Sequence, residues 1–259
     1  MEKLYYLFSE YYHSILKDTI IRTPNSKVIE LLNKKFIHTF RVVQNAREIC
    51  IRENFPDRVC IMAEIAALFH DIGRFKQAVE YSSFNDKETF NHAAVSAGIF
   101  NSLKYDILKV IDEKEFSIVK NSILYHNVLS LPKHLTEDEI EISNILRDAD
   151  KLNILSINIK SGFIKGDGSL PYDEVINDKC LESLLSKQVV NVQDIYTNID
   201  DNIKMLSWMY DLNYKASLDM YLEEGYIDIL TDTTNIASSE IINQLNDIKH
   251  ILTRYINNK

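Results

Sequence analysis

Glycine and proline, the residues that most often interrupt helices, are scarce in this chain. Its 259 residues include 6 glycines and 4 prolines. The apolar residues recur mostly at helical spacing rather than in strict alternation, which is typical of helices and not of strands. We therefore predict an all-α fold. A chain of this length can bury a core of full size, either as one large domain or as one domain with a substantial extension.

Helix start and stop signals divide the first part of the chain. One long helix is predicted from the segment TPNSKVIELL through Ile49, and a second from Pro56 and Asp57 to near Gly73. Asn91 is a good N-cap for the next helix. Two more helices are predicted, in KEFSIVKNSILYHNVL and in EDEIEISNILRDADKLNIL. We thus expect five helices before residue 156.

The segment SGFIKGDGSLPYD, with three glycines and a proline, is the clearest loop in the chain. Such a segment predicts a domain boundary or a lid. We place a helical core in residues 1–155 and a helical C-terminal extension in residues 156–259. The extension is expected to pack on the core.

Composition and charge exclude several classes of protein. The hydrophobic fraction of 46% and the charged fraction of 26% are those of an ordinary globular protein. The net charge is −9 and no long basic run occurs, so we expect no binding to long nucleic acids.

The cysteines and the N-terminal segment bear on the cellular location. The three cysteines are odd in number and form no CxxC pair, which favours a reducing compartment. The N-terminal segment lacks the basic start and unbroken apolar stretch of a signal peptide. No segment approaches the roughly 20 apolar residues that span a bilayer. We therefore expect a cytoplasmic protein with no membrane partner.

Four histidines and two aspartates stand where apolar helices begin, end or present one face. In the segment AALFHDIGRF, a run of apolar residues ends in a histidine and an aspartate, which are expensive to desolvate. Imidazole and carboxylate groups bind divalent first-row metals, and metal sites in helical bundles collect such groups from several facing helices. A bound metal would compensate the desolvation. The six residues are His38, His70, Asp71, His92, His126 and Asp150.

The neighbouring pair His70 and Asp71 needs a helix end to act together. On a regular helix adjacent side chains point about 100° apart, whereas at a helix end the backbone turns and both can converge on one centre. With its two oxygens, Asp71 could also bridge a pair of metals about 3.5–4 Å apart.

The order of these residues resembles that of the HD-domain metal-dependent phosphohydrolases. That family has a histidine, a His-Asp doublet, optional further histidines and a late aspartate. Here the same order is met in the segments FIHTFRVVQ, HDIGRF, NHAAVSAGIF, ILYHN and LRDADKLNIL. The resemblance covers roughly residues 35 to 155. It implies an HD-domain helical bundle for the core.

The resemblance also implies a ligand set for two divalent ions of iron, manganese, cobalt, nickel or magnesium. The ligands of one ion would be His38, His70, Asp71 and Asp150. A second ion would be held by His92 and His126, with Asp71 shared. The resemblance favours Asp150 over Asp148, which on a helix points to nearly the opposite side.

The activity implied by the resemblance is metal-dependent hydrolysis of phosphoester bonds. Two metals bridged by hydroxide provide a nucleophile at neutral pH and polarise a phosphoryl oxygen. Asp71 would be catalytic as the shared ligand. Arg74 and Lys151 would direct positive charge at the non-bridging oxygens. The expected substrate is a small phosphorylated metabolite or nucleotide, in a pocket lined in part by residues 156–259.

Two alternatives share this ligand set. One is an HD-type di-iron protein that resembles inositol oxygenase and activates dioxygen, and metal identity separates it from a hydrolase. The other is a non-catalytic nucleotide-binding or signalling module, whose usual sign is a missing ligand, whereas all six are present. The segment KQAVEYSSFNDKETFN lacks the Gly-Tyr-Pro element of the branch that cleaves cyclic dinucleotides. The oligomeric state is left open.

Overall fold

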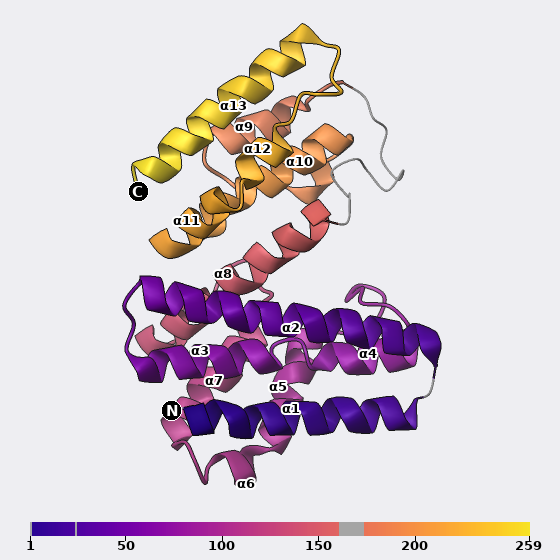
Figure 1. Ribbon diagram of the computed structural model, residues 1–259, viewed down its shortest axis with the longest axis vertical. Coiled ribbons are helices and arrows are strands. Elements are labelled where there is room, and N and C mark those ends of the chain that lie inside the picture. Colours follow the sequence, from indigo (N-terminus) through magenta and orange to yellow (C-terminus); the bar gives the residue numbers. More distant parts are fainter. Residues whose placement is uncertain (1, 24, 161–173) are drawn as a thin grey trace. The chain divides into compact units, whose positions relative to one another are not determined.

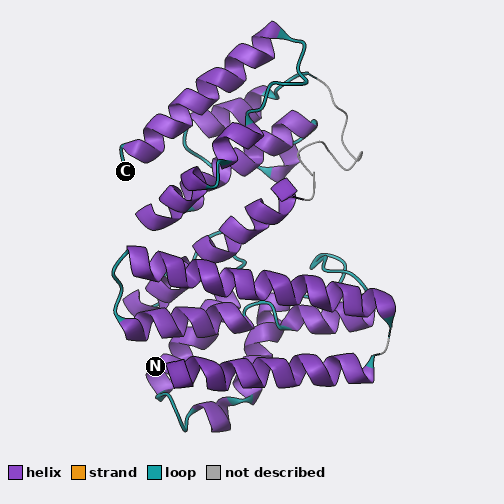
Figure 2. Ribbon diagram, in the orientation of Figure 1, coloured by secondary structure: helices purple, strands orange, loops and turns teal. Residues whose placement is uncertain are grey.

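The computed structural model describes residues 2–23, 25–160 and 174–259 (Figure 1). All regular elements in these ranges are helices, and none of the described residues lies in a strand (Figure 2). The predicted all-α fold is therefore confirmed. The predicted loop at residues 161–173, with its proposed role as a boundary or lid, lies outside the described residues.

The chain divides into two compact units, Met1–Asp150 and Lys151–Lys259. The boundary predicted after residue 155 lies inside helix α8, and the division falls after Asp150. The predicted packing of the C-terminal extension on the core stays a prediction. No helix in the described ranges has an apolar stretch long enough to cross a bilayer.

The first unit contains helices α1 to α7 and the N-terminal part of α8. Their bounds are α1 (Glu2–Arg22), α2 (Ser26–Arg52), α3 (Asp57–Phe69), α4 (Gly73–Tyr81), α5 (His92–Ser102), α6 (Lys104–Ile107), α7 (Glu113–Tyr125) and α8 (Glu137–Lys160). Eight helices thus begin before residue 156 in the described ranges, so the expected number of five was wrong. Helices α1, α4 and α6 were not predicted. Gly73 begins helix α4, whereas the sequence suggested only the end of the preceding helix.

The second unit contains the rest of α8 and the C-terminal helices. Their bounds are α9 (Asp178–Leu185), η2 (Val192–Asp194), α10 (Asn198–Ser207), η3 (Trp208–Asp211), α11 (Lys215–Glu223), α12 (Tyr226–Leu230) and α13 (Ser239–Asn257). Helices α11 and α12 pack against α13, and α9 packs against α10. The elements η2 and η3 are short 3-10 helices.

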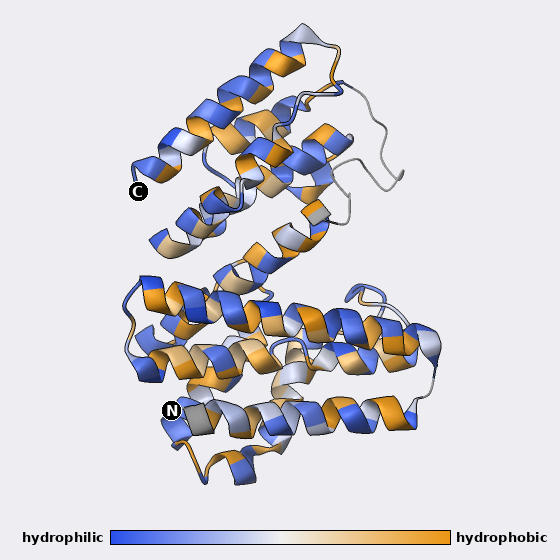
Figure 3. Ribbon diagram, in the orientation of Figure 1, coloured by the Kyte–Doolittle hydropathy of each residue, from blue (hydrophilic) through white to orange (hydrophobic). Residues whose placement is uncertain are grey.

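Helix α3 is the central helix of the first unit and is mostly apolar (Figure 3). It packs against α1, α2, α5 and α7, and every residue from Ile61 to Phe69 is buried. A helix that is covered on all sides needs no polar face. Helix α3 therefore crosses the core, and the His-Asp doublet lies at its C-terminal end.

Aromatic contacts anchor the end of α3. The ring of Phe69 packs edge-on against Phe8 and Tyr12 of α1, with centroids 6.2 Å and 6.4 Å apart. It also packs against Phe100 of α5 at 5.3 Å. Edge-to-face packing of buried rings is favourable and directional. The residue before the doublet is therefore held by two other helices.

Gly73 allows the turn after α3 to approach α5 closely. A Cβ atom at this position would lie 2.5 Å from the carbonyl oxygen of His92 and 2.9 Å from the backbone nitrogen of Ser96. The backbone N–H of Gly73 donates a hydrogen bond of 2.8 Å to Oγ of Ser96. Because glycine has no side chain, the backbones can meet here. The doublet consequently lies next to the first turn of α5.

Candidate metal centre

The six predicted ligands lie close together in the first unit. Their ligand atoms form three overlapping groups, and the atoms of each group lie within 4.8 Å of one another. The groups are His38, His70 and Asp71; His70, His126 and Asp150; and Asp71, His92 and His126. Five of the six residues are buried. Because the groups overlap, the division of the ligands between two ions stays a prediction.

Helix ends place most of these side chains. His70 is the C-cap of α3 and His126 is the C-cap of α7. His92 is the first residue of α5, after the N-cap Asn91. Asp71 follows His70 in the turn before α4. Because a helix ends or begins at each of these points, side chains from three helix ends can face one centre.

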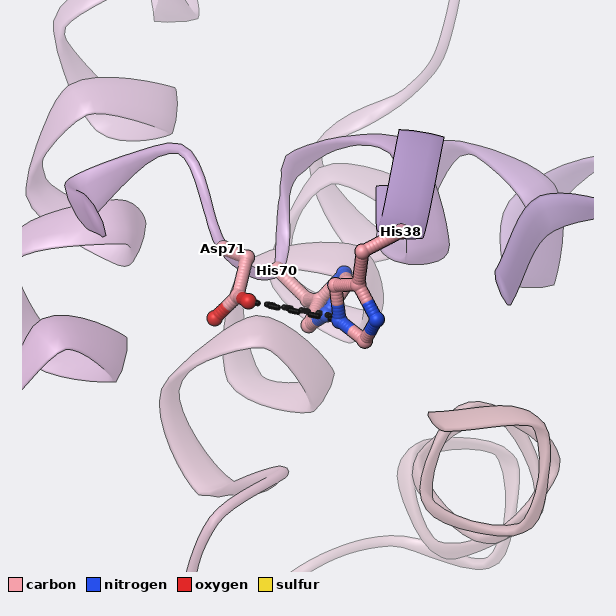
Figure 4. A group of neighbouring side chains, drawn as sticks. All are labelled: His38, His70 and Asp71. Carbon is pink, nitrogen blue, oxygen red and sulfur yellow. Dashed lines mark hydrogen bonds and ion pairs between the residues drawn. The ribbon is translucent and has the colours of Figure 1, made fainter. Parts of the chain in front are cut away.

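The carboxylate of Asp71 lies between two sets of imidazoles. Its Oδ2 atom is 3.4 Å from Nε2 of His38 and 3.6 Å from Nε2 of His70 (Figure 4). Its Oδ1 atom is 3.2 Å from Nε2 of His92. The side chain is 4% exposed. One oxygen of Asp71 therefore faces each set of imidazoles.

Asp150 adds a second carboxylate on the side of His38 and His70. Its Oδ1 atom lies 3.2 Å from Nε2 of His38 and 3.8 Å from Nε2 of His70. This oxygen is buried, and apart from the ring of His38 it has no hydrogen-bond partner among the described residues. A buried carboxylate with so little compensation is costly, and a cation at this position would stabilise it. Asp148 is also fully buried and belongs to none of the three ligand groups.

Hydrogen bonds from Nδ1 orient three of the histidines. His70 and His126 each donate Nδ1–H to the carbonyl oxygen three residues earlier, at 2.6 Å and 2.8 Å. Nδ1 of His92 lies 2.6 Å from Oδ2 of Asp86. A carbonyl or carboxylate oxygen can only accept, so the Nδ1 atoms carry the protons. In the neutral rings the Nε2 atoms then keep their lone pairs.

These lone pairs point at one another. Nε2 of His92 lies 3.1 Å from Nε2 of His126. Burial lowers the pKa of both rings to about 4, so both are neutral at pH 7. Two lone pairs at this distance repel unless a cation accepts both. The donor set therefore fits a divalent metal, whose charge would turn the repulsion into ligation.

His38 differs from the other three histidines in its proton affinity. Burial lowers its pKa, but the carboxylates of Asp150 and Asp71 outweigh burial and raise the pKa of His38 to about 9. Burial also raises the pKa of Asp71, and the ammonium of Lys35 and the ring of His70 outweigh that effect and hold this pKa well below its usual range. In the metal-free protein, the proton on His38 therefore sits between two carboxylates.

We expect the histidine contribution to the stability of the metal-free protein to be largest near pH 6.5. The pKa of His38, about 9, lies above its ordinary value of 6.5, so its stabilising contribution is complete below pH 6.5 and is lost as the pH rises towards 9. The pKa values of His92 and His126, about 4, lie below 6.5. Protonation of the unfolded chain at these positions therefore lowers stability as the pH falls from 6.5 towards 4.

Thermal unfolding of chelator-treated protein from about pH 4 to about pH 9 measures this dependence. His38→Gln should remove the alkaline decline and keep the acidic one. Metal-loaded protein should also lose the alkaline decline, because a metal replaces the proton on Nε2. An alkaline limb that persists in His38→Gln would assign the decline to another group.

Lys35 is a site residue that we did not predict from the sequence. Its Nζ atom lies 2.6 Å from Oδ2 of Asp71 and 5.2 Å from the centroid of the Phe84 ring. Its side chain is 19% exposed. Lys35 precedes His38 by three residues on α2, and residues three apart share a helix face. That spacing was the available signal.

Asp86 is the second residue that we did not predict. Its Oδ2 atom accepts from Nδ1 of His92, and its Oδ1 atom accepts from Arg74 at 2.7 Å and from Gln77 at 2.9 Å. A carboxylate on the outer nitrogen of a metal-binding histidine fixes the orientation of the ring. Asp86 lies in the irregular segment between α4 and α5, where no periodicity connects it to His92.

Replacing Asp86 by asparagine should weaken metal binding by roughly 10–100-fold, because the amide has a single accepting oxygen and cannot accept from both His92 and Arg74 as the carboxylate does. The measurement is a competition titration of metal against a chromophoric chelator. Asp106→Asn, at a half-exposed aspartate of α6 that pairs with Lys109, is the matched control and should leave the affinity unchanged. Equal affinities in the two variants would exclude this role for Asp86.

The two cations expected to bind the substrate occupy different environments. Nε of Arg74 lies 3.4 Å from Oδ1 of Asp71 and is buried without a hydrogen-bond partner. The ammonium of Lys151 is bound to Asp211 of the second unit, 2.5 Å from Oδ2 and 3.0 Å from the carbonyl oxygen. The structure thus brings Arg74 to the ligand cluster and engages Lys151 with Asp211. The catalytic roles of both stay predictions.

The fold and the cluster together define an all-helical protein with a candidate His/Asp metal centre. The family model of the HD domain matches residues 36–155, a range that contains all six of these histidines and aspartates. Residues 36–155 are thus similar to the HD domain, whose superfamily consists of metal-dependent proteins of hydrolase type. The resemblance noted in the sequence is confirmed. No curated protein and no solved structure gave a match.

Proposed function

We propose that this protein is a metal-dependent phosphohydrolase with a dinuclear centre. The observation that carries the proposal is the position of Asp71, whose Oδ2 lies 3.4 Å from Nε2 of His38 and whose Oδ1 lies 3.2 Å from Nε2 of His92. A carboxylate with one oxygen toward each set of imidazoles suits two ions about 3.5–4 Å apart. The substrate is proposed to be a phosphoester of a small metabolite or a nucleotide.

Two ions would be held by residues from several helices of the first unit. The proposed ligands of the first ion are His38, His70, Asp71 and Asp150. Those of the second ion are His92 and His126, together with Asp71. The imidazole-rich donor set favours iron, cobalt or nickel over magnesium, and manganese, which accepts carboxylate ligands, stays a candidate. Bound at this position, such ions activate water at neutral pH and polarise a phosphoryl oxygen.

The protein itself would supply orientation and positive charge. The backbone carbonyl oxygens and Asp86 keep the lone pairs of the imidazoles directed at the centre. Arg74 and Lys35 bring two cationic groups to the two oxygens of Asp71. Charge placed there in advance stabilises the negative oxygens of a phosphoryl group in its transition state. Lys151 could add to this charge only by leaving Asp211.

The test is metal reconstitution followed by a phosphate-release assay. Metal-free protein is loaded with manganese, iron, cobalt, nickel or magnesium, the metal content per chain is measured, and a panel of phosphomonoesters and nucleotides is offered. We expect two ions per chain and release of phosphate from at least one compound. Substrate-dependent oxygen consumption by the iron form without phosphate release would instead identify a di-iron oxygenase. Binding without turnover would identify a non-catalytic module.

The proposed partners follow from the charge and the thiols. A net charge of −9 favours small ligands at a local cationic site over long nucleic acids. The cysteines Cys50, Cys60 and Cys180 are free thiols. We therefore propose the cytoplasm, a reducing compartment, as the site of action.

A further inference from the structure

The second unit contains a cavity that the metal centre does not use. Its volume is about 450 Å³, which falls within the roughly 300–1,000 Å³ of small-molecule sites. The lining residues come from the end of α9 and the residues after it, from η3, and from the C-terminal half of α13 and the two residues after it. Helices α9 and α13 are labelled in Figure 1. No acidic side chain lines the cavity. All of its walls belong to the second unit.

Three cations line this cavity: Lys187, Arg254 and Lys259. None of the three forms an ion pair with a carboxylate in the part of the chain that the structure describes, whereas Lys249, also on α13, is paired with Asp228 at 2.6 Å. The chain as a whole carries a net charge of −9. Three unpaired cations around one hollow therefore create a local positive potential that attracts anions. Basic residues near the C-terminal end of a helix can also stabilise the helix dipole. That role alone would not require the three cations to surround a cavity.

A tyrosine holds two of these cations in place. The ammonium groups of Lys187 and Lys259 lie 5.3 Å and 5.4 Å from the centroid of the Tyr255 ring. An ammonium over an aromatic face is attracted by the ring. The ring of Tyr210 meets Tyr255 edge-on, with centroids 5.1 Å apart. The cationic groups are thus positioned beside aromatic surface.

Apart from the amide of Asn258, the remaining wall is aliphatic and aromatic and is partly exposed to solvent. Leu185 is 50% exposed and Ile251 is 44% exposed, and both line the cavity with Tyr210. Burial raises the pKa of Tyr210 to about 12, so its hydroxyl is neutral and can donate a hydrogen bond. An aliphatic and aromatic wall of this kind suits a flat ring, which would cover the exposed apolar groups.

The backbone of Lys187 is unusual. Its φ angle is +58°, and its N–H donates to the carbonyl oxygen of Leu184 at the end of α9. Glycine is the usual residue at this left-handed position after a helix, because it has no Cβ to strain the backbone. Lysine at this position makes the fold less stable than glycine would, but it brings an ammonium group to the cavity.

We propose that this cavity binds a ligand of the nucleotide class. The phosphates would lie against the three cations, and the base would lie against Tyr210, Leu185 and Ile251. This site is separate from the proposed hydrolytic centre and needs no metal. The proposal can therefore be tested independently of the proposed function.

Calorimetric titration of the full chain in the presence of a chelator tests the proposal. The probes are adenosine and guanosine triphosphate, with inorganic triphosphate and adenosine as partial ligands. At least one nucleotide should bind, more tightly than either type of fragment. Lys187→Gln and Arg254→Gln should each weaken binding about tenfold or more, the usual loss for a hydrogen bond to a charged group. Lys249→Gln should leave it unchanged. The affinity should also fall as salt is added, because exposed charges are screened.

Binding that both cavity variants leave unchanged would overturn the proposal, as would no binding of either nucleotide. Inorganic triphosphate that binds as tightly as the nucleotides would overturn the assignment of a base to the apolar wall. A further variant, Lys187→Gly, separates function from folding. It should raise the melting temperature, because the strained position is relieved, and it should weaken nucleotide binding. A variant that is both more stable and equally tight would also contradict the proposal.

Discussion

Asp71→Asn should abolish phosphoester hydrolysis and the retention of metal in a protein that still folds. The change replaces a carboxylate that faces both sets of imidazoles by a neutral amide with a single oxygen. One side of the centre then meets an amide N–H₂ group, which cannot bind a metal. The loss of metal affinity should exceed the roughly 10–100-fold expected for partners outside the ligand set.

The measurements are metal content after reconstitution and phosphate release with the best substrate. Asp106→Asn carries the same change on the surface of the first unit, and it should keep the activity of the unaltered protein. Circular dichroism would show that Asp71→Asn remains helical. Full turnover in this variant would refute the proposed role of Asp71, and turnover lost with two ions still bound would mean that Asp71 acts in some other way than as a ligand.

Lys35→Met should have opposite effects on the metal-free and metal-bound states. In the metal-free protein, Nζ of Lys35 lies 2.6 Å from Oδ2 of Asp71, and its loss leaves a buried carboxylate with less compensation. We expect the free energy of unfolding to fall by about 2 kcal/mol, typical for a hydrogen bond to a charged group. A metal competes with Lys35 for the same oxygen, so its affinity should rise, by roughly tenfold if most of this energy reappears on binding.

Chemical denaturation in chelator measures the first effect, and a competition titration with metal measures the second. The matched control is Lys34→Met, because Lys34 is adjacent in the chain, 65% exposed and paired with Glu30. It should change neither quantity. Weaker metal binding in Lys35→Met would show that Lys35 supports the metal state rather than competes with it.

The predicted helices show what local patterns can and cannot decide. Helix start signals and the apolar spacing were sufficient for α2, α5, α7 and α8. They fail at Gly73, where the sequence predicts only the end of a helix. The reason for a glycine there is the backbone of α5, which would lie 2.5 Å from an added Cβ. A contact between segments distant in the chain leaves no local pattern.

The candidate site shows the same division. The six histidines and aspartates could be predicted because their residue types and order are distinctive, and they are the residues that the structure brings together. Asp86 and Lys35 could not be predicted as site residues, because a lone aspartate in a loop and a lysine on a helix are common in any sequence. For Lys151 the sequence predicted a role in the site that its contacts do not support. Lys151 is next to Asp150 in the chain, but its ammonium group binds Asp211, a contact that the sequence does not indicate.

The order of residues alone was enough to predict an all-α fold and a cluster of candidate metal ligands in the first part of the chain. Helical periodicity and ligand type are properties of the residues themselves, so they can be read without coordinates. Only the packed structure revealed that the lone pairs of His92 and His126 meet at 3.1 Å and that Asp71 offers one oxygen to each side. Those features depend on the relative positions of helices that lie far apart in the chain, and long-range packing fixes these positions.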